Sequence, residues 1–176
     1  YLKTLSMSDN YVPFIAVTPK NGAEFDLVES WMVESLVPAI DQSYRTIPVS
    51  AYRGIGGLSR GAGIAMQVAL KHPEQFGQVH LSMLAHFRQT NEIEQWIQAL
   101  PPDQTPLIFI SIGEDDITLL DQSAELRTLL IAHQIPHQYE VMPGGHTLAF
   151  WRSQWEKYAD WHMRHFGLQM RSPPFD

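Results

Sequence analysis

Short apolar runs alternate along the chain with longer segments whose apolar residues recur every three to four positions. The short runs are typical of buried strands and the longer segments of amphipathic helices. The predicted strands are residues 14–18, 51–58, 78–84, 107–112 and 137–142. The predicted helices are residues 25–44, 61–72, 92–100, 119–133 and 148–165. This alternation predicts an α/β fold with a doubly wound, mostly parallel sheet.

Length and composition are those of one globular domain over residues 1–176. The chain is 44% hydrophobic with five tryptophans, enough for a substantial core. Its net charge of −7 contains no block of like charges, so we expect neither a nucleic-acid partner nor an anionic membrane. The absence of cysteine excludes disulfides, a thiol nucleophile and thiolate metal sites. No run of about 18 apolar residues and no leader peptide is visible, which leaves the compartment open.

Ser59 lies in a Gly-x-Ser-x-Gly pattern, Gly57-Leu-Ser-Arg-Gly61, between a predicted strand and a predicted helix. This placement is that of the nucleophile elbow of α/β-hydrolases, where a very tight turn exposes the serine. We expect side chains at Gly57 and Gly61 to collide as strand and helix approach. The N–H groups that open the helix, Arg60 first, would face a developing oxyanion. A phosphate-binding turn is the alternative, but no lysine follows as in a P-loop.

A serine nucleophile needs a base and an orienting carboxylate, which follow it in α/β-hydrolases in the order acid, then histidine. Gly113-Glu-Asp-Asp116 ends one predicted strand, and Pro143-Gly-Gly-His146 ends the next. Open α/β sheets carry their sites at this edge. One of Asp115 and Asp116 is therefore the expected acid and His146 the expected base. The alternatives are solvated loop charges or a helix N-cap for the aspartates, and a backbone-bonded loop histidine.

His162 and His165 lie three residues apart on the last predicted helix. This spacing suits a metal pair, but no third ligand is evident in the sequence. We expect solvated or core-edge roles for both histidines, and neither a metal nor an organic cofactor.

Five stretches of the chain share a family pattern. They are Leu36-Val-Pro-Ala-Ile-Asp-Gln-Ser-Tyr44, Gly56-Gly-Leu-Ser-Arg-Gly61, His72-Pro-Glu-Gln-Phe-Gly77, Gly113-Glu-Asp-Asp116 and Pro143-Gly-Gly-His-Thr-Leu-Ala-Phe-Trp151. Together they resemble the putative-esterase family, which includes feruloyl, acetyl xylan and enterochelin esterases, esterase D and the mycolyltransferases. The likeness covers most of residues 12–160 and is closest to the feruloyl and acetyl xylan esterase branch. It implies an α/β-hydrolase fold with Ser59 as nucleophile, His146 as base and, by the Gly-x-x-Asp pattern, Asp116 as acid.

The chain departs from this family at three places. Arg60 stands where a small or apolar residue is usual, and Ala62 where glycine is usual. The backbone N–H of Arg60 can still donate to an oxyanion, and we expect its side chain to form an ion pair within the protein rather than meet an acidic substrate group. Family members also carry several strands before the strand expected at 14–18, and one of their loops supplies a second oxyanion donor. Nothing in residues 1–12 resembles that loop, so we expect an N-terminally incomplete domain.

These observations predict a serine carboxylic-ester hydrolase that works through Ser59, His146, Asp116 and an acyl-enzyme. An acyltransferase with the same triad is one alternative, since no residue excludes water or selects an acceptor. A non-catalytic carbohydrate- or partner-binding domain is another. The expected substrate is a small-molecule or carbohydrate-linked ester, which the sequence does not specify further. Phe150 and Trp151 either line the substrate site or pack the last helix. The sequence also leaves open whether the protein forms a homo-oligomer.

Overall fold

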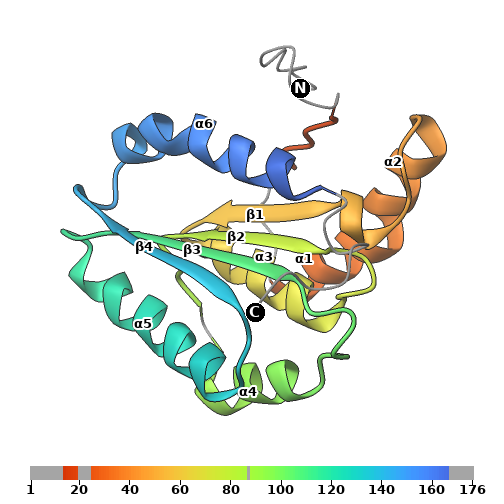
Figure 1. Cartoon of the computed structure of the whole chain (residues 1–176). Helices are drawn as coiled ribbons and strands as arrows, with labels where there is room; N and C mark the ends of the chain where they lie inside the picture. The colour runs from red at the N-terminus through yellow and green to blue at the C-terminus, as the bar shows by residue number, and fades with distance from the viewer. Residues whose placement is uncertain (1–13, 20–24, 87, 167–176) are drawn as a thin grey trace.

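A computed structural model describes residues 14–19, 25–86 and 88–166. Its four strands form one sheet in the order β1 (Gly54–Leu58), β2 (Gln78–Ser82), β3 (Leu107–Gly113) and β4 (His137–Met142). Each neighbouring pair is parallel, so all carboxyl ends meet at one edge, on the left of Figure 1. Because neighbouring strands are also consecutive in the chain, this sheet agrees with the parallel α/β arrangement that the sequence predicts.

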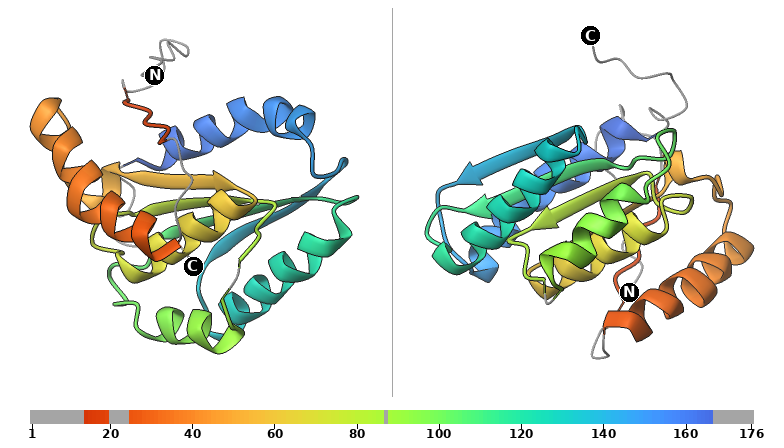
Figure 2. Two further views of the ribbon diagram at one scale, coloured as in Figure 1. Left: turned by 180° about the vertical axis from the view of Figure 1, so that it is seen from behind. Right: turned by 90° about the horizontal axis from the view of Figure 1, so that it is seen from below.

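Six α-helices accompany the sheet in the described ranges. They are α1 (Phe25–Trp31), α2 (Val37–Ser43), α3 (Arg60–Lys71), α4 (Thr90–Gln98), α5 (Ile117–Ala132) and α6 (Leu148–His165). Figures 1 and 2 show α6 on one face of the sheet and α1, α3, α4 and α5 on the opposite side. No helix of the described residues is long and apolar enough to cross a membrane.

Two predicted strands are corrected by the structure. Residues 14–19 have no regular secondary structure, although a strand was expected over 14–18. Ile15 and Val17 are 40% and 39% exposed there, and within the described residues this segment pairs with no strand. The strand expected over 51–58 begins only at Gly54, since Ser50–Tyr52 forms a 3₁₀ turn.

The helix expected over 25–44 is interrupted by one π-helical turn, Met32–Leu36. The N–H of Val37 donates to the carbonyl of Met32, five residues earlier, instead of the usual four. Pro38 lies in the first turn of α2 and has no N–H to continue the regular pattern. The wider turn lets the chain pass this proline and continue as α2.

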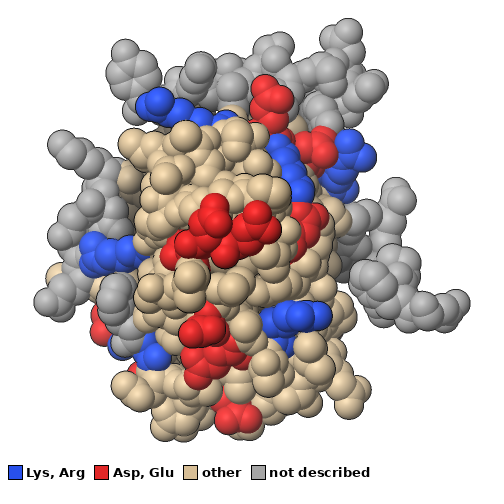
Figure 3. All heavy atoms as spheres, turned by 90° about the vertical axis from the view of Figure 1, so that its left-hand side faces the viewer, with Lys and Arg blue, Asp and Glu red and all other residues tan. Residues whose placement is uncertain are grey.

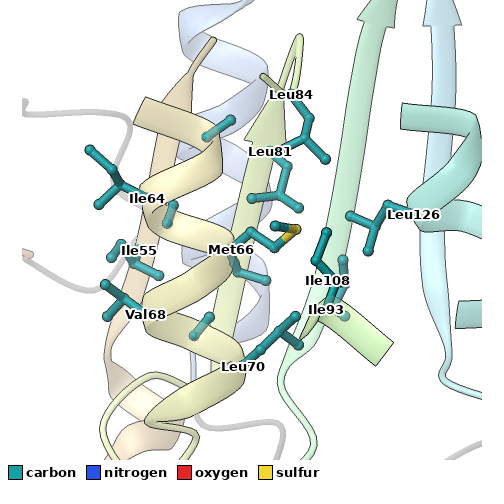
Figure 4. Packing of buried hydrophobic residues seen from close by; sticks show 14 of the residues in the cluster. Ile55, Ile64, Met66, Val68, Leu70, Leu81, Leu84, Ile93, Ile108 and Leu126 are labelled. Carbon is teal, nitrogen blue, oxygen red and sulfur yellow. The ribbon is translucent and has the colours of Figure 1, made fainter. Parts of the chain in front are cut away.

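The main hydrophobic core lies between the sheet and α3. Residues 62–70 of this helix are all buried, so α3 has no solvent face. Met66 lies in one cluster with Leu81 of β2 and Ile108 of β3 (Figure 4). Ile93 of α4 and Leu126 of α5 belong to the same cluster. This burial anchors the helix whose first residue follows Ser59.

The opposite face of the sheet is more polar where α6 covers it. His80 and Ser111 are buried there, and Nε2 of His80 is 3.1 Å from the hydroxyl of Ser111. The Tyr158 hydroxyl of α6 is 3.2 Å from the Ser111 hydroxyl, and the Tyr158 ring lies 3.8 Å from the His80 ring between centroids. One turn later, Nδ1 of His162 is 3.1 Å from Oε1 of Gln78. Hydrogen bonds thus supplement apolar contacts in holding α6 on the sheet.

Burial keeps these two histidines neutral. Desolvation, followed by the nearby charges of His162 and Lys157, lowers the pKa of His80 well below its ordinary value. Desolvation, followed by the charge of His165, lowers the pKa of His162 from 6.5 to about 4. The unfolded chain therefore binds protons near pH 6.5 that the folded chain accepts only at lower pH. Protonation favours unfolding, and stability falls as the pH drops through this window.

We predict that His162→Gln reduces the loss of unfolding free energy between pH 6.5 and 4, measured by urea titration at several pH values. The contribution removed is at most roughly 3 kcal/mol. The wild type must be the reference, because ion pairs such as that of Glu29 with Lys71 also weaken in acid. His137→Gln, on β4 outside this cluster, is the matched control for the loss of a histidine side chain. Equal slopes for wild type and His162→Gln would contradict the assignment.

Candidate active site

Ser59 occupies the sharp turn that joins β1 to α3. Its backbone angles, φ 54° and ψ −122°, lie in a region that side chains other than glycine rarely adopt. Its N–H donates to the carbonyl of Ser82 at 2.9 Å, and its carbonyl accepts the N–H groups of Ala62 at 2.9 Å and Ala85 at 3.3 Å. These bonds tie the strained residue to both β2 and α3. Such over-determined strain is typical of functional positions.

Gly57 is the glycine on which this turn depends. A Cβ at Gly57 would lie 2.1 Å from both the carbonyl carbon and the oxygen of Gly61. The predicted collision at Gly61 itself is wrong, because a Cβ there would have no atom within 4 Å outside its own helix backbone. The α-carbon of Gly57 lies against the backbone carbonyl of Gly61. A side chain at Gly61 would instead point away from this contact.

Arg60 begins α3 directly after the serine. Its N–H therefore belongs to the first turn, the positive end of the helix, as the sequence predicts. The guanidinium carbon of Arg60 lies 5.1 Å from the ring centroid of Phe25 in α1. This cation–π contact was not among the roles expected for the side chain, and it packs the arginine against the protein.

Asp116 and His146 meet at the carboxyl edge. Nδ1 of His146 is 2.7 Å from Oδ2 of Asp116, whose side chain is 9% exposed, against 38% for the histidine. Asp116 occupies the N-cap position of α5, but among the described residues its side chain makes no capping hydrogen bond. The structure thus separates the two aspartates, because Asp115 is an exposed neighbour and Asp116 contacts the imidazole.

Two close backbone approaches bring these loops together. A Cβ at Gly113 would lie 2.2 Å from the carbonyl oxygen of Gly144. The N–H of Glu114 donates to the carbonyl of Met142 at 2.8 Å, and that of Asp115 to Gly144 at 3.0 Å. The loop after β4 therefore lies directly on the loop after β3. The sequence analysis did not single out Gly113, although a glycine at the end of a strand, just before the Glu-Asp-Asp116 loop, is a signal of close backbone approach.

The Asp116 contact fixes the chemistry of the imidazole. A carboxylate only accepts hydrogen bonds, so Nδ1 of His146 carries a proton and donates a hydrogen bond to Asp116. Nε2 is then left with its lone pair, which is the form of histidine that acts as a general base.

Ser59 is farther along the sheet. It follows β1 and His146 follows β4, so three strand spacings of about 4.8 Å each, or roughly 14 Å, separate the two strands. In the described residues the Ser59 hydroxyl is not hydrogen-bonded to His146. Met83, which follows β2, bridges part of this span. Its N–H donates to Ser111 at 2.7 Å, and a Cβ at Gly113 would lie 2.8 Å from its methyl carbon.

The remaining candidates have structural contacts. His162 bonds to Gln78, and Nδ1 of His165 is 2.6 Å from the carbonyl of Trp161. Within the described residues, no three or more His, Cys, Asp or Glu side chains lie together so as to hold a metal ion. The segment expected to lack a second oxyanion donor, residues 1–12, lies outside the described residues.

Phe150 and Trp151 are distinguished by the structure. Phe150 is 6% exposed and packs in a small core with Met83 and Ile112. Trp151 packs partly against the same core, and its ring centroid is 5.0 Å from that of His146 with the planes at 76°. Both residues therefore pack α6, and Trp151 also contacts the imidazole. The sequence left these roles open because helical spacing alone does not identify a partner from another loop.

We predict that Gly57→Ala destabilises the protein by about 3 kcal/mol or more, because the added methyl group overlaps the Gly61 backbone. Gly61→Ala is the matched control. It meets open space on a helix, and we expect a change within about 1 kcal/mol, in the stabilising direction. Urea unfolding of the two variants measures this difference. Equal losses of stability in both would contradict the one-sided approach.

Known proteins resemble this chain in sequence and in fold. Residues 6–158 match the family described as Putative esterase. Among solved structures, a ferulic acid esterase is similar with a TM-score of 0.68 and 23% identity, over 79% of this chain and 61% of that protein. The structure of a protein named FAE is similar with a TM-score of 0.71 and 16% identity, over 93% of this chain and 67% of that protein. The S-formylglutathione hydrolase FrmB from Staphylococcus aureus is similar with a TM-score of 0.62 and 16% identity, over 79% of this chain and 64% of that protein.

The chain thus spans 61% to 67% of the length of these three proteins. At such identities the structural likeness carries the fold, and the family match covers most of the sequence. The parallel sheet flanked by helices is the part of this chain that the likeness covers. The chain belongs to the Putative esterase family and has the α/β-hydrolase fold.

Proposed function

We propose that this chain is a serine carboxylic-ester hydrolase in which Ser59, His146 and Asp116 act as a catalytic triad. The observation that carries the proposal is the 2.7 Å hydrogen bond from Nδ1 of His146 to Asp116. This bond leaves Nε2 as a base at the same sheet edge as a serine held in a strained strand-to-helix turn. Membership of an esterase family supports the same chemistry.

In the proposed reaction, Nε2 of His146 takes the proton of the Ser59 hydroxyl as the serine oxygen attacks the ester carbonyl. The N–H of Arg60 and the positive end of α3 stabilise the tetrahedral oxyanion. His146 then returns the proton to the leaving alcohol, and the acyl group stays on Ser59. A water molecule deprotonated by His146 releases the acid and restores the serine. Asp116 orients the imidazole throughout and stabilises its charged form.

The proposal requires the His146 loop to reach Ser59. The loop already lies over the end of β3, since Gly144 contacts Gly113 and accepts a hydrogen bond from Asp115. Met83, which follows β2, is buried beneath this edge between the loops after β1 and β3. Catalytic hydrogen bonds are often long or absent without substrate and form in the complex. In the proposed complex Nε2 of His146 lies within hydrogen-bond distance of the Ser59 hydroxyl, and the ester carbonyl lies against the Ser59 oxygen.

A neutral ester is the substrate that suits this edge of the sheet. Asp and Glu side chains gather near the middle of the face shown in Figure 3, which is the side of the carboxyl edge. A negative field disfavours substrates that carry carboxylates of their own. Ile117, directly after Asp116, and Leu148, two residues after His146, are 74% and 64% exposed and offer apolar contact. Small-molecule or carbohydrate-linked esters therefore fit the proposal.

Labelling with a fluorophosphonate tests the nucleophile. We expect one label per chain on Ser59, located by peptide mass spectrometry, because only an activated serine attacks the phosphorus rapidly. Ser59→Ala should lose both the label and the hydrolysis of p-nitrophenyl acetate. Ser43→Ala, at the exposed end of α2, is the control and should label like the wild type. A folded wild type that takes no label would overturn the proposal.

Substitution of the two neighbouring aspartates tests the acid. Asp116→Asn keeps the shape of the side chain but offers the imidazole a donor or a neutral acceptor, and we expect kcat to fall by about 10³- to 10⁴-fold. Asp115→Asn should change kcat by less than about threefold, because that side chain is exposed and does not contact the imidazole in the described structure. Steady-state hydrolysis by both variants measures the contrast. Equal losses, or a larger loss for Asp115→Asn, would exclude Asp116 as the acid.

A further inference from the structure

The histidine loop passes into α6 through a rigid junction. Thr147 is the N-cap of α6, and its hydroxyl accepts the N–H of Phe150 at 3.1 Å. Its own N–H donates to the carbonyl of Gly145 at 2.7 Å. His146 is therefore held between a capped helix and a glycine turn. Its backbone is well defined, while the imidazole still needs side-chain contacts to fix the plane of its ring.

The hydrogen bond to Asp116 leaves one rotation of the imidazole undetermined. One contact at Nδ1 holds that nitrogen in place but still allows the ring to tilt about the line joining the two residues. The side chain of His146 is 38% exposed, so solvent does not restrain the opposite edge. A second contact is needed before Nε2 points in a single direction.

Trp151 supplies this second contact. Its indole meets the imidazole at 76° with 5.0 Å between ring centroids, an edge-to-face geometry that aromatic pairs favour. The indole is itself immobilised, because it packs against the core of Met83, Ile112 and Phe150. The backbone N–H of Trp151 also donates to the carbonyl of Thr147 at 3.2 Å. A ring fixed in this way limits the tilt that the Asp116 bond allows.

The indole N–H indicates that packing alone does not explain this residue. Nε1 of Trp151 is buried and, within the described part of the chain, has no hydrogen-bond partner. An unpaired buried donor is unfavourable for folding. A phenylalanine would cover the same small core without this donor. The contact that the larger ring makes in the described part of the chain, besides its packing on this core, is the one with the His146 imidazole.

We propose that Trp151 is a positioning residue, which holds the His146 imidazole in the plane where Nδ1 meets Asp116 and Nε2 faces the bound ester. This inference rests on the proposed function. A positioning role for Trp151 differs from a role in contacting the substrate. A positioning residue changes kcat, because misaligned proton transfer slows the chemical steps, whereas a residue that only lines the substrate site changes KM.

Three variants test the proposal with p-nitrophenyl acetate as substrate. Trp151→Met replaces the ring by a flexible apolar chain, and we expect kcat to fall by about 10- to 100-fold with KM within about twofold of the wild type. Trp151→Phe keeps a smaller ring and should lose less, with little loss of stability because the unpaired N–H is gone. Trp155→Met, one turn later on α6 and 49% exposed, is the matched control and should retain kcat.

A spectroscopic measurement separates this proposal from the proposed function. In ¹⁵N-labelled protein, the Nδ1 proton of His146 bonded to Asp116 should give a protected low-field resonance, which Asp116→Asn identifies by its loss. We expect this resonance to broaden or disappear in Trp151→Met and to persist in Trp155→Met. It is observable even if the wild type neither labels nor hydrolyses an ester, in which case the proposed function fails and the resonance still decides on positioning.

Each outcome decides on Trp151. A raised KM with unchanged kcat would show that it only lines the substrate site. An unchanged kcat and an unchanged resonance in Trp151→Met would overturn the proposal. Should Trp151→Met fail to fold, Trp151→Phe decides, because a kcat equal to that of the wild type in this folded variant would also overturn it.

Discussion

The contact between β1 and α3 at Gly57 is the constraint on which the candidate site depends. Strand and helix touch through backbone atoms there, since a Cβ at Gly57 would lie 2.1 Å from the Gly61 carbonyl. Only this approach makes the turn short enough to hold Ser59 at a positive φ. A residue in such a conformation costs of order 1–3 kcal/mol. The hydrogen bonds of Ser59 to Ser82 and to the buried helix α3 offset that cost, so the rigidity of the core is transmitted to one serine.

A close backbone contact of the same kind occurs at the same carboxyl edge, beside β3 and β4. Gly113 and Gly144 let the loops after β3 and β4 approach through their backbones, and Asp116 and His146 meet as a result. Because the sheet is parallel and its strands are ordered as in the chain, every loop that follows a strand reaches the same edge. The topology brings the candidates to one side of the molecule. The glycines then determine which of them come into contact.

Local pattern predicted the four described strands and most of the helices, and it placed an aspartate and a histidine in adjacent loops. The resemblance to the family then favoured Asp116 as the partner of His146. Strands of buried apolar residues, followed by loops with carboxylates or a histidine, are visible without coordinates. What local pattern missed depends on partners remote in sequence. Residues 14–18 have the composition of a strand but no strand partner in the described sheet, so Ile15 and Val17 stay exposed. The cation–π contact of Arg60 with Phe25 and the contact of Trp151 with His146 likewise need the tertiary fold.

Helix α6 has two roles that limit how the site can move. Its central residues bind the polar face of the sheet, where the Tyr158 hydroxyl is 3.1 Å from that of Ser82 and 3.2 Å from that of Ser111. Its first turn begins directly after His146. A shift of the whole helix would break the buried bonds of Tyr158, so the helix is a poor hinge. The turn at Gly144, with a φ of 124°, is also held, because its carbonyl accepts the N–H of Asp115 at 3.0 Å. Closure of His146 onto Ser59 would therefore have to carry the loops after β3 and β4 together.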